Sequence, residues 1–169
     1  MVKWLKFSYI TMTIIFLTGC VSVDDKQRRS QNVIELNDIT SHKSDCDSKA
    51  EQFDLLKREC IMSRDLNCVT KLERLAFEMH QDANFLSGKA IYSNYHDFEN
   101  MAYTATMICG QHACRTTLET ADVYFSLGDK ENAKRLYREV ITTFTGTAYA
   151  GFVKKAEFAL EDLKAVQRK

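Results

Sequence analysis

The chain has 169 residues, with 23 Lys and Arg against 23 Asp and Glu, so its formal net charge is zero. This balance lacks the basic excess expected of a nucleic-acid-binding domain. The chain has no proline and only 6 glycines. Because these two residues interrupt helices most strongly, the composition predicts an all-α fold.

The first residues have the layout of an export signal. Lys3 and Lys6 provide positive charge, and the apolar run from Phe7 to Leu17 is too short to cross a bilayer ~30 Å thick as a helix. Leu17-Thr18-Gly19-Cys20 then resembles the lipobox of bacterial lipoproteins. The resemblance implies that residues 1–19 are removed as a signal peptide and that Cys20 becomes the lipid-modified first residue.

The residues after Cys20 bear on where such a protein is sent. They are Val21 and Ser22, with no Asp directly after the cysteine, which is similar to the signal for the outer membrane in Gram-negative lipoproteins. The resemblance therefore implies a lipid-anchored protein that faces the periplasm. The alternatives are an ordinary secretory signal or a buried apolar helix, either with a chance cysteine.

Residues 20–47 are polar and show little core-forming periodicity. They predict a flexible, lipidated tether with an r.m.s. span of ~30 Å. The alternative is an arm that becomes ordered when it binds a partner. The folded domain is expected over residues 48–169.

From Ser48 onward, apolar residues recur with a helical period. Gly88 is expected to be a weak point within one helix, and breaks are expected at Gly110, at Gly128-Asp129 and at Gly146-Thr147, with Asp129 and Thr147 as N-caps. The pattern predicts about seven short helices packed as antiparallel hairpins.

An internal repeat occurs at an offset of 46 residues. Cys68-x-Thr70-x-Leu72-Glu73 matches Cys114-x-Thr116-x-Leu118-Glu119. Within the second block, the pattern Ala121-x₂-Tyr124-x₃-Gly128-Asp129-x₃-Ala133-x₃-Tyr137 resembles a tetratricopeptide repeat (TPR) over residues 114–147. The resemblance implies a right-handed superhelix of helix hairpins, in which small Ala residues allow close approach and Tyr side chains fill the crevices.

Six cysteines occur in the chain. An exported protein meets an oxidising environment, so disulfides are expected. Cys60–Cys68 and Cys109–Cys114 each span a predicted connection between helices, and the first spacing resembles that of disulfide-stapled TPR-like proteins. Cys46 is then left over, either free or paired with another chain.

No catalytic constellation, cofactor motif or phosphate-binding loop is present in the sequence. Cys109, His112 and Cys114 offer a metal site as an alternative to the disulfide, but they lack the close pairs typical of zinc sites. A Cys114–His112 nucleophile conflicts with oxidation of Cys114. We therefore expect no enzyme activity and no cofactor or metal.

The expected role is a membrane-anchored scaffold or assembly factor, similar to pilotin lipoproteins, that binds an envelope protein. The alternatives are a small blocking lipoprotein (an exclusion or immunity factor) and an envelope hydrolase. In TPR families the first helix of each repeat lines a groove. The matching positions, which we expect to bind the partner or else to be core, are Arg115, Leu118, Asp122 and Phe125, with Met79 in the first block.

Overall fold

The computed structural model describes residue 33, residues 35–92 and residues 96–167. The expected signal peptide, Cys20 and the first part of the tether lie outside these residues. The chain divides into two compact units, Met1–Asp38 and Ile39–Lys169, and the account below concerns the second. Within the described ranges no strand occurs, which confirms the all-α expectation. None of the described helices combines the length and apolar character needed to cross a bilayer.

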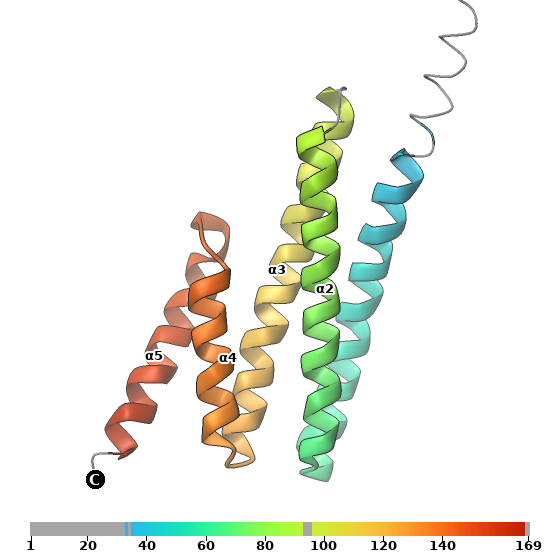
Figure 1. Ribbon diagram of the computed structural model, residues 1–169. Coiled ribbons are helices and arrows are strands. Elements are labelled where there is room, and N and C mark those ends of the chain that lie inside the picture. The colour runs from blue at the N-terminus through green and yellow to red at the C-terminus, as the bar shows by residue number, and fades with distance from the viewer. Residues whose placement is uncertain (1–32, 34, 93–95, 168–169) are drawn as a thin grey trace, which may run out of the picture. The chain divides into compact units, whose positions relative to one another are not determined.

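Five helices and one 3₁₀ turn make up the described part of the chain. An N-terminal helix covers residues 35–63. It is followed by α2 (Leu66–Tyr92), α3 (His96–Ser126), α4 (Lys130–Thr143), the 3₁₀ turn η1 (Thr147–Tyr149) and α5 (Ala150–Gln167). Successive helices run antiparallel, as Figure 1 shows.

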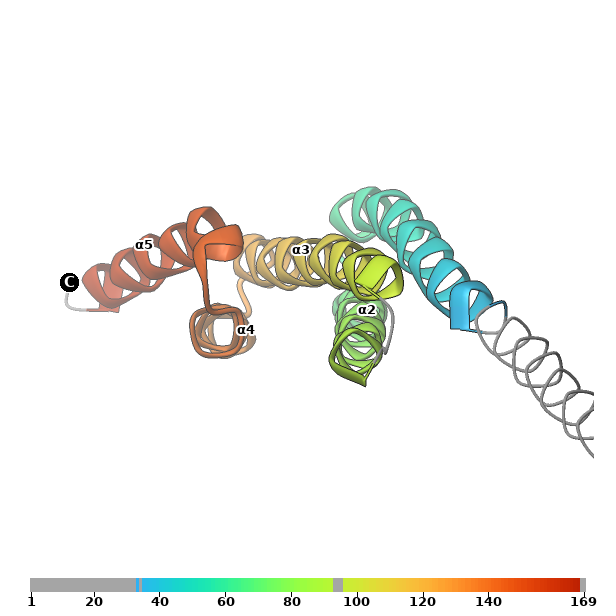
Figure 2. The same ribbon diagram turned by 90° about the horizontal axis from the view of Figure 1, so that it is seen from above.

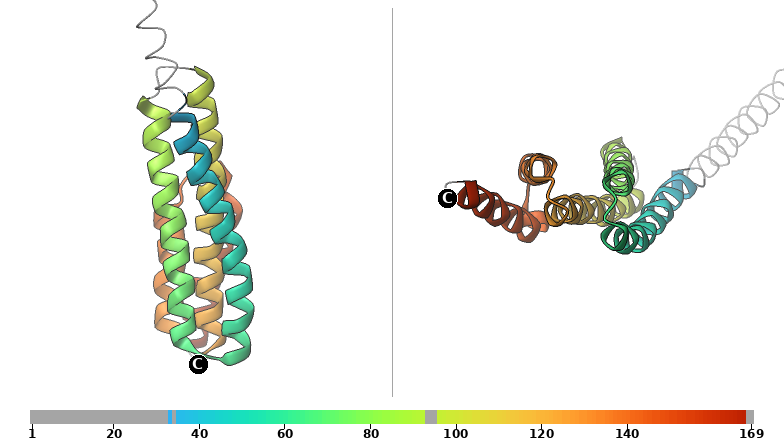
Figure 3. Two further views of the ribbon diagram at one scale, coloured as in Figure 1. Left: turned by 90° about the vertical axis from the view of Figure 1, so that its right-hand side faces the viewer. Right: turned by 90° about the horizontal axis from the view of Figure 1, so that it is seen from below.

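The helices form two layers. Seen from above, the N-terminal helix, α3 and α5 make one row, and α2 and α4 lie apart from each other on the same side of that row (Figure 2). The view from below shows the same two rows (Figure 3). α3 packs against α2, α4 and α5, whereas α2 and α4 make no backbone contact with each other in the described residues. α3 is thus the central element.

The core is built from large side chains on the N-terminal helix and α2 and from small ones on α3. Phe53, Leu72, Met79 and Leu86 are fully buried. The side of α3 that faces neighbouring helices carries buried small residues: Ala102, Ala105, Ala113, Thr116, Thr117, Thr120 and Ala121. Small side chains let neighbouring helices approach closely, so one long helix can contact several others.

The expected seven short helices are wrong, because α2 and α3 are each longer than expected. Gly88 lies inside α2 without ending it, and the break expected at Gly110 is absent because Gly110 lies inside α3. An exposed glycine in a helix costs only about 1 kcal/mol relative to alanine, and packing of the two long helices offsets it. At Gly110 the ring of Tyr149 occupies the space that a side chain would need. An added Cβ would collide with the hydroxyl oxygen of Tyr149 and lie 3.2 Å from its Cζ.

The hairpin that resembles a TPR has the expected local packing. Ala121 and Ala133 are fully buried, and Tyr124 and Tyr137 are 3% and 2% exposed. Gly128 adopts a left-handed backbone with φ of 91°, and Asp129 caps α4 as expected. Thr147 does not cap the last helix, because it begins η1 after Gly146 and no side-chain cap bond forms there.

The boundary expected between tether and domain is also wrong. Residues 35–47 are helical, and the compact unit begins at Ile39 rather than at residue 48. Ile39, Cys46 and Phe53 are 3%, 0% and 0% exposed. Their seven-residue spacing places them on one face of a helix. These three apolar positions bury one side of an otherwise polar segment.

Candidate protein-binding groove

The stripe expected to bind a partner is largely built into the core. Met79 is 0% exposed and Leu118 is 5% exposed, so the expectation that these two side chains line an open groove is wrong. They are covered because α3 has neighbouring helices on several sides. Phe125 is the apolar member that stays accessible, at 43% exposure.

The two charged members of the stripe make contacts within the protein. Asp122 accepts a hydrogen bond of 2.6 Å from the hydroxyl of Tyr137. Burial raises the pKa of Asp122, and this hydrogen bond lowers it in part. Arg115 donates to both carboxylate oxygens of Asp54, at 2.9 and 3.4 Å. Both side chains therefore tie helices of this protein together.

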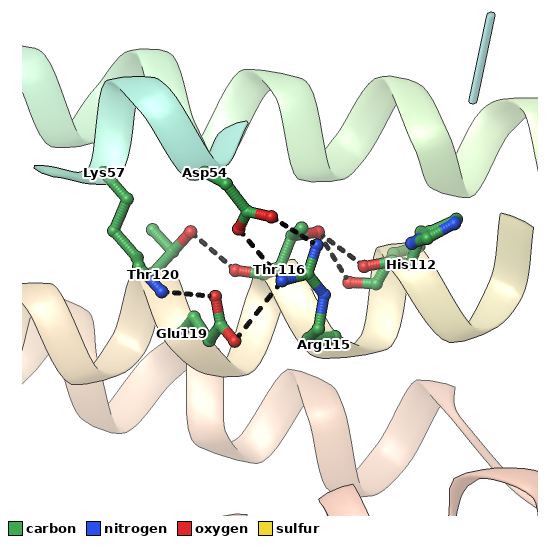
Figure 4. Close-up of polar contacts among 8 residues, drawn as sticks. Asp54, Lys57, His112, Arg115, Thr116, Glu119 and Thr120 are labelled. Carbon is green, nitrogen blue, oxygen red and sulfur yellow. Dashed lines mark hydrogen bonds and ion pairs between the residues drawn. The ribbon is translucent and has the colours of Figure 1, made fainter. Parts of the chain in front are cut away.

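A seam of ion pairs joins the N-terminal helix to α3 (Figure 4). Arg115 also lies 3.7 Å from Glu119, and Lys57 lies 2.8 Å from the same carboxylate. One turn earlier on α3, Nε2 of His112 is 3.3 Å from Asp47. The charges alternate and pair off across the two helices, so this surface is a structural seam rather than a ligand site.

The cysteines pair differently from the expectation in one case. Cys60–Cys68 forms as expected, with the two Cα atoms 5.3 Å apart. Cys109 pairs with Cys46 instead of Cys114, with a Cα separation of 5.7 Å. The expected Cys109–Cys114 bridge is wrong because both residues lie within α3. Five residues along one helix turn the two side chains about 140° apart.

Cys114 is the free cysteine of the described residues, and it is buried. Burial raises the pKa of its thiol to about 12. The thiolate is the reactive form of cysteine, so this environment disfavours the nucleophile considered from the sequence. Among the residues described, no group of three or more His, Cys, Asp or Glu side chains is arranged to hold a metal ion.

A groove lies where α2 and α4 leave α3 uncovered between them. Its volume is about 480 Å³, and its lining comes from all three helices: Thr70, Glu73, Arg74, Ala76, Phe77, Thr117, Thr120, Arg135, Leu136 and Glu139. α3 forms the floor together with Ala76 of α2 and Leu136 of α4, and the other lining residues of α2 and α4 form the walls. On α3 the groove is lined by Thr117 and Thr120 instead of the expected Arg115, Leu118, Asp122 and Phe125.

The floor of the groove is apolar in character. The hydroxyl of Thr117 donates to the carbonyl of Ala113 at 2.8 Å, and that of Thr120 donates to the carbonyl of Thr116 at 2.7 Å. The hydroxyl protons are thus used within α3. Ala76 and Leu136 complete the floor at 3% and 1% exposure, which leaves a surface suited to an apolar side chain.

Charged side chains form the rim. Arg135 on α4 donates to Glu73 on α2 at 2.7 Å and lies 3.6 Å from Glu139. The second oxygen of Glu73 accepts from the hydroxyl of Tyr124 at 3.3 Å. Burial, followed by the charge of Glu73, raises the pKa of Tyr124 to about 12, so this hydroxyl stays a donor. The rim is thereby held by a fixed set of polar contacts.

An aromatic ring stands on the α2 wall. Phe77 is 57% exposed, although it lies among the groove-lining residues. Three residues further along α2, His80 packs edge-on against Phe144 with ring centroids 5.4 Å apart. The chain that follows α4 therefore contacts α2 beyond Phe77.

The sequence contains a signal for this groove that the sequence analysis missed. Thr70, Glu73, Arg74 and Phe77 recur at i, i+3, i+4 and i+7, which places them on one face of α2 beside the buried stripe.

No family model matches the chain, and no significant match was found among curated proteins or solved structures.

Proposed function

We propose that this chain is a membrane-anchored scaffold that binds a segment of an envelope protein in the groove between α2 and α4. The observation that supports this is a groove of about 480 Å³ that combines an apolar floor with an exposed aromatic ring and a charged rim. Sites of this kind bury an apolar anchor and use a few polar groups for orientation.

The chemistry of the groove defines what the partner presents. Ala76, Thr117 and Leu136 favour one apolar side chain on the floor, and Phe77 adds aromatic contact at the edge. The rim carries both signs of charge. A segment that places an apolar residue between charged ones matches this arrangement, because it satisfies the rim without burying an unpaired charge.

The anchoring part of the proposal rests on Leu17-Thr18-Gly19-Cys20 and on the cysteine chemistry. Two disulfides link the described helices, and disulfides persist mainly in oxidising compartments outside the cytoplasm. We therefore place the domain in the envelope, held by a lipid on Cys20. Val21 and Ser22 favour the outer membrane, with the domain facing the periplasm.

The test uses a pair of matched aromatic positions. Phe77 in the groove and Phe158 on α5 are 57% and 56% exposed, so the photoreactive amino acid benzoylphenylalanine can replace either with similar accessibility. In the full chain, in the cells that produce it, we expect a discrete cross-linked protein from position 77 and none from position 158.

Two further variants connect that adduct to the groove. Thr117→Arg fills the floor and should abolish the adduct from position 77, whereas Phe158→Ala should leave it unchanged. Circular dichroism and the melting temperature check that both variants fold. Identical adducts from positions 77 and 158, or no adduct from position 77, would contradict the proposal.

A further inference from the structure

The turn between the N-terminal helix and α2 carries three exposed aliphatic side chains. Ile61, Met62 and Leu66 are 47%, 78% and 42% exposed, and we call them the apolar tip. The Cys60–Cys68 disulfide closes the turn, Arg64 N–H donates to the carbonyl of Cys60 at 3.0 Å, and Asn67 N–H donates to Asp65 at 2.9 Å. The tip is thus preorganised, which lowers the entropy cost of binding.

An apolar pocket lies on the same helix at the other end. It has a volume of about 430 Å³ between the N-terminal helix and the first turns of α3, and it is lined by Ile39, Thr40, Lys43, Met101, Thr104 and Ala105. Ile39 and Ala105 form its base at 3% and 1% exposure, and Met101 stands at the edge at 44%. Since a cavity of ~150 Å³ accommodates benzene, this pocket has room for more than one aliphatic side chain.

We infer that the pocket receives the apolar tip of a second copy of this chain. Pocket and tip are separate surfaces about 20 residues apart along one helix, or ~30 Å at the helical rise, and they lie at opposite ends of the hairpin in Figure 1. One copy cannot place its own tip in its own pocket. Contact between two different surfaces is heterologous and repeats head to tail.

The charges around the two surfaces are complementary. The tip is flanked by an excess of base, from Arg58, Arg64 and Lys71 against Glu59 and Asp65. The chain around the pocket carries more acid than base: Asp45, Asp47 and Glu99 against the lining residue Lys43, of which Asp47 lies 2.8 Å from Lys43 and 3.3 Å from His112. Opposite net charges steer the two surfaces together and disfavour contact between two tips or two pockets.

The size of the contact sets how the assembly should behave. A stable interface buries about 800 Å² on each partner, and three side chains supply less than that. Association between free copies is therefore weak, and it rises when copies are concentrated. For this reason the test traps the contact covalently.

The first test places benzoylphenylalanine at Leu66 of the full chain in the cells that produce it. We expect a ladder of covalent dimers and larger adducts, with cross-linked peptides that map to residues 100–105 of another copy. Adducts only with lipid, only with an unrelated protein, or between two tips would overturn the inference.

A second test uses the asymmetry of the contact. Met62→Asp places a charge in the apolar tip, and Met101→Asp places one at the edge of the apolar pocket, so each should block its own surface. Both side chains are exposed enough to be replaced without unfolding the chain. Each variant alone should lose the ladder. Co-expression of a Met62→Asp copy with a Met101→Asp copy that carries the photoprobe should restore one adduct, a heterodimer.

The design separates this inference from the proposed function. The α2–α4 groove is intact in both variants, so the adduct from Phe77 should be retained when the ladder is lost. A ladder that survives in either variant, or a mixture that yields no heterodimer, overturns the head-to-tail contact. Equal melting temperatures of the variants and the unchanged chain exclude unfolding as the cause.

Discussion

Asp129 holds the start of α4 through two hydrogen bonds that it accepts from Asn132. Its carboxylate accepts from the backbone N–H of Asn132 at 3.1 Å and from the side-chain amide at 2.8 Å. These hydrogen bonds lower the pKa of Asp129. A lowered pKa in the folded state means that the ionised carboxylate stabilises the fold more than the protonated acid does.

Replacing Asp129 should therefore give a pH-dependent loss of stability. Asp129→Ala removes the cap and should cost about 1 kcal/mol at neutral pH. The contribution of the charge is present above the unfolded-state pKa and is lost as the pH falls through the lower folded-state pKa. Urea unfolding at neutral and strongly acidic pH should show a smaller difference between variant and parent in acid. A constant or larger difference in acid would contradict this account.

Gly110 and Gly88 both lie within helices, but replacing them with alanine should change the stability of the fold in opposite directions. A Cβ at Gly88 meets nothing within 4 Å, whereas one at Gly110 collides with Tyr149. Gly88→Ala should raise stability by up to about 1 kcal/mol. Gly110→Ala should lower it by about 1–3 kcal/mol, since overpacking displaces Tyr149 and the η1 turn.

A double-mutant cycle assigns the cost at Gly110 to one atom. Tyr149→Phe removes the hydroxyl oxygen that a Cβ at Gly110 would meet first. Gly110→Ala should then cost less in the Tyr149→Phe background than in the parent, as measured by thermal unfolding. An equal cost in both backgrounds would show that the close approach to Tyr149 is not the reason for glycine at this position.

At the scale of whole helices, the two disulfides constrain different parts of the chain. Cys60–Cys68 spans 8 residues and fixes the turn between neighbouring helices. Cys46–Cys109 spans 63 residues and holds the N-terminal helix against α3 across the layer, alongside the ion pairs of Arg115 and Lys57. The longer link constrains more of the unfolded chain.

Removing each link should reveal this difference. Loop-closure entropy gives about 4 kcal/mol for the 63-residue link and about 2.5 kcal/mol for the 8-residue link. Cys46→Ser with Cys109→Ser should therefore lower the free energy of unfolding more than Cys60→Ser with Cys68→Ser. Peptide mapping without reductant should recover Cys46–Cys109 and Cys60–Cys68. A Cys109–Cys114 peptide would contradict the pairing described above.

At the scale of the whole molecule, the proposed attachment to a membrane can be tested directly. Two or more acyl chains are needed for firm anchoring, because a single chain binds only marginally. If Cys20 is lipidated, the chain should incorporate labelled palmitate and fractionate with membranes, and Cys20→Ala should lose the label. Cys46→Ala serves as a control cysteine that should keep it. Labelling that persists in Cys20→Ala would reject the lipobox interpretation.

Much of the fold could be predicted from local patterns. The turn at Gly128-Asp129 and the packing of Ala121, Tyr124 and Ala133 follow from short-range spacing and residue size. The same reasoning failed at Gly110, because the tolerance of a helix for glycine depends on which helices pack against it. It also missed Ile39 and Cys46, since three apolar residues at intervals of seven give a weak signal within a polar segment.

The groove was harder to predict than the fold. Taken alone, the helix that carries Arg135 and Glu139 presents them as an ordinary solvated charged face. Glu73 lies 62 residues from Arg135 in sequence and 2.7 Å from it in space. A site made from three helices exists only after they are packed, so its members share a spacing within α2 but none across the three helices.

The sequence by itself determined the helical class, the N-cap at Asp129 and the closeness of Cys60 and Cys68. These depend on backbone preference and on contacts between residues near each other in the chain. Only the tertiary structure decided that Cys46 meets Cys109, that Leu118 and Met79 are core, and that the open groove faces the side of α2 and α4. Each of these depends on how long helices pack around α3, and the direction of a side chain on a helix acquires meaning only when its neighbours are in place.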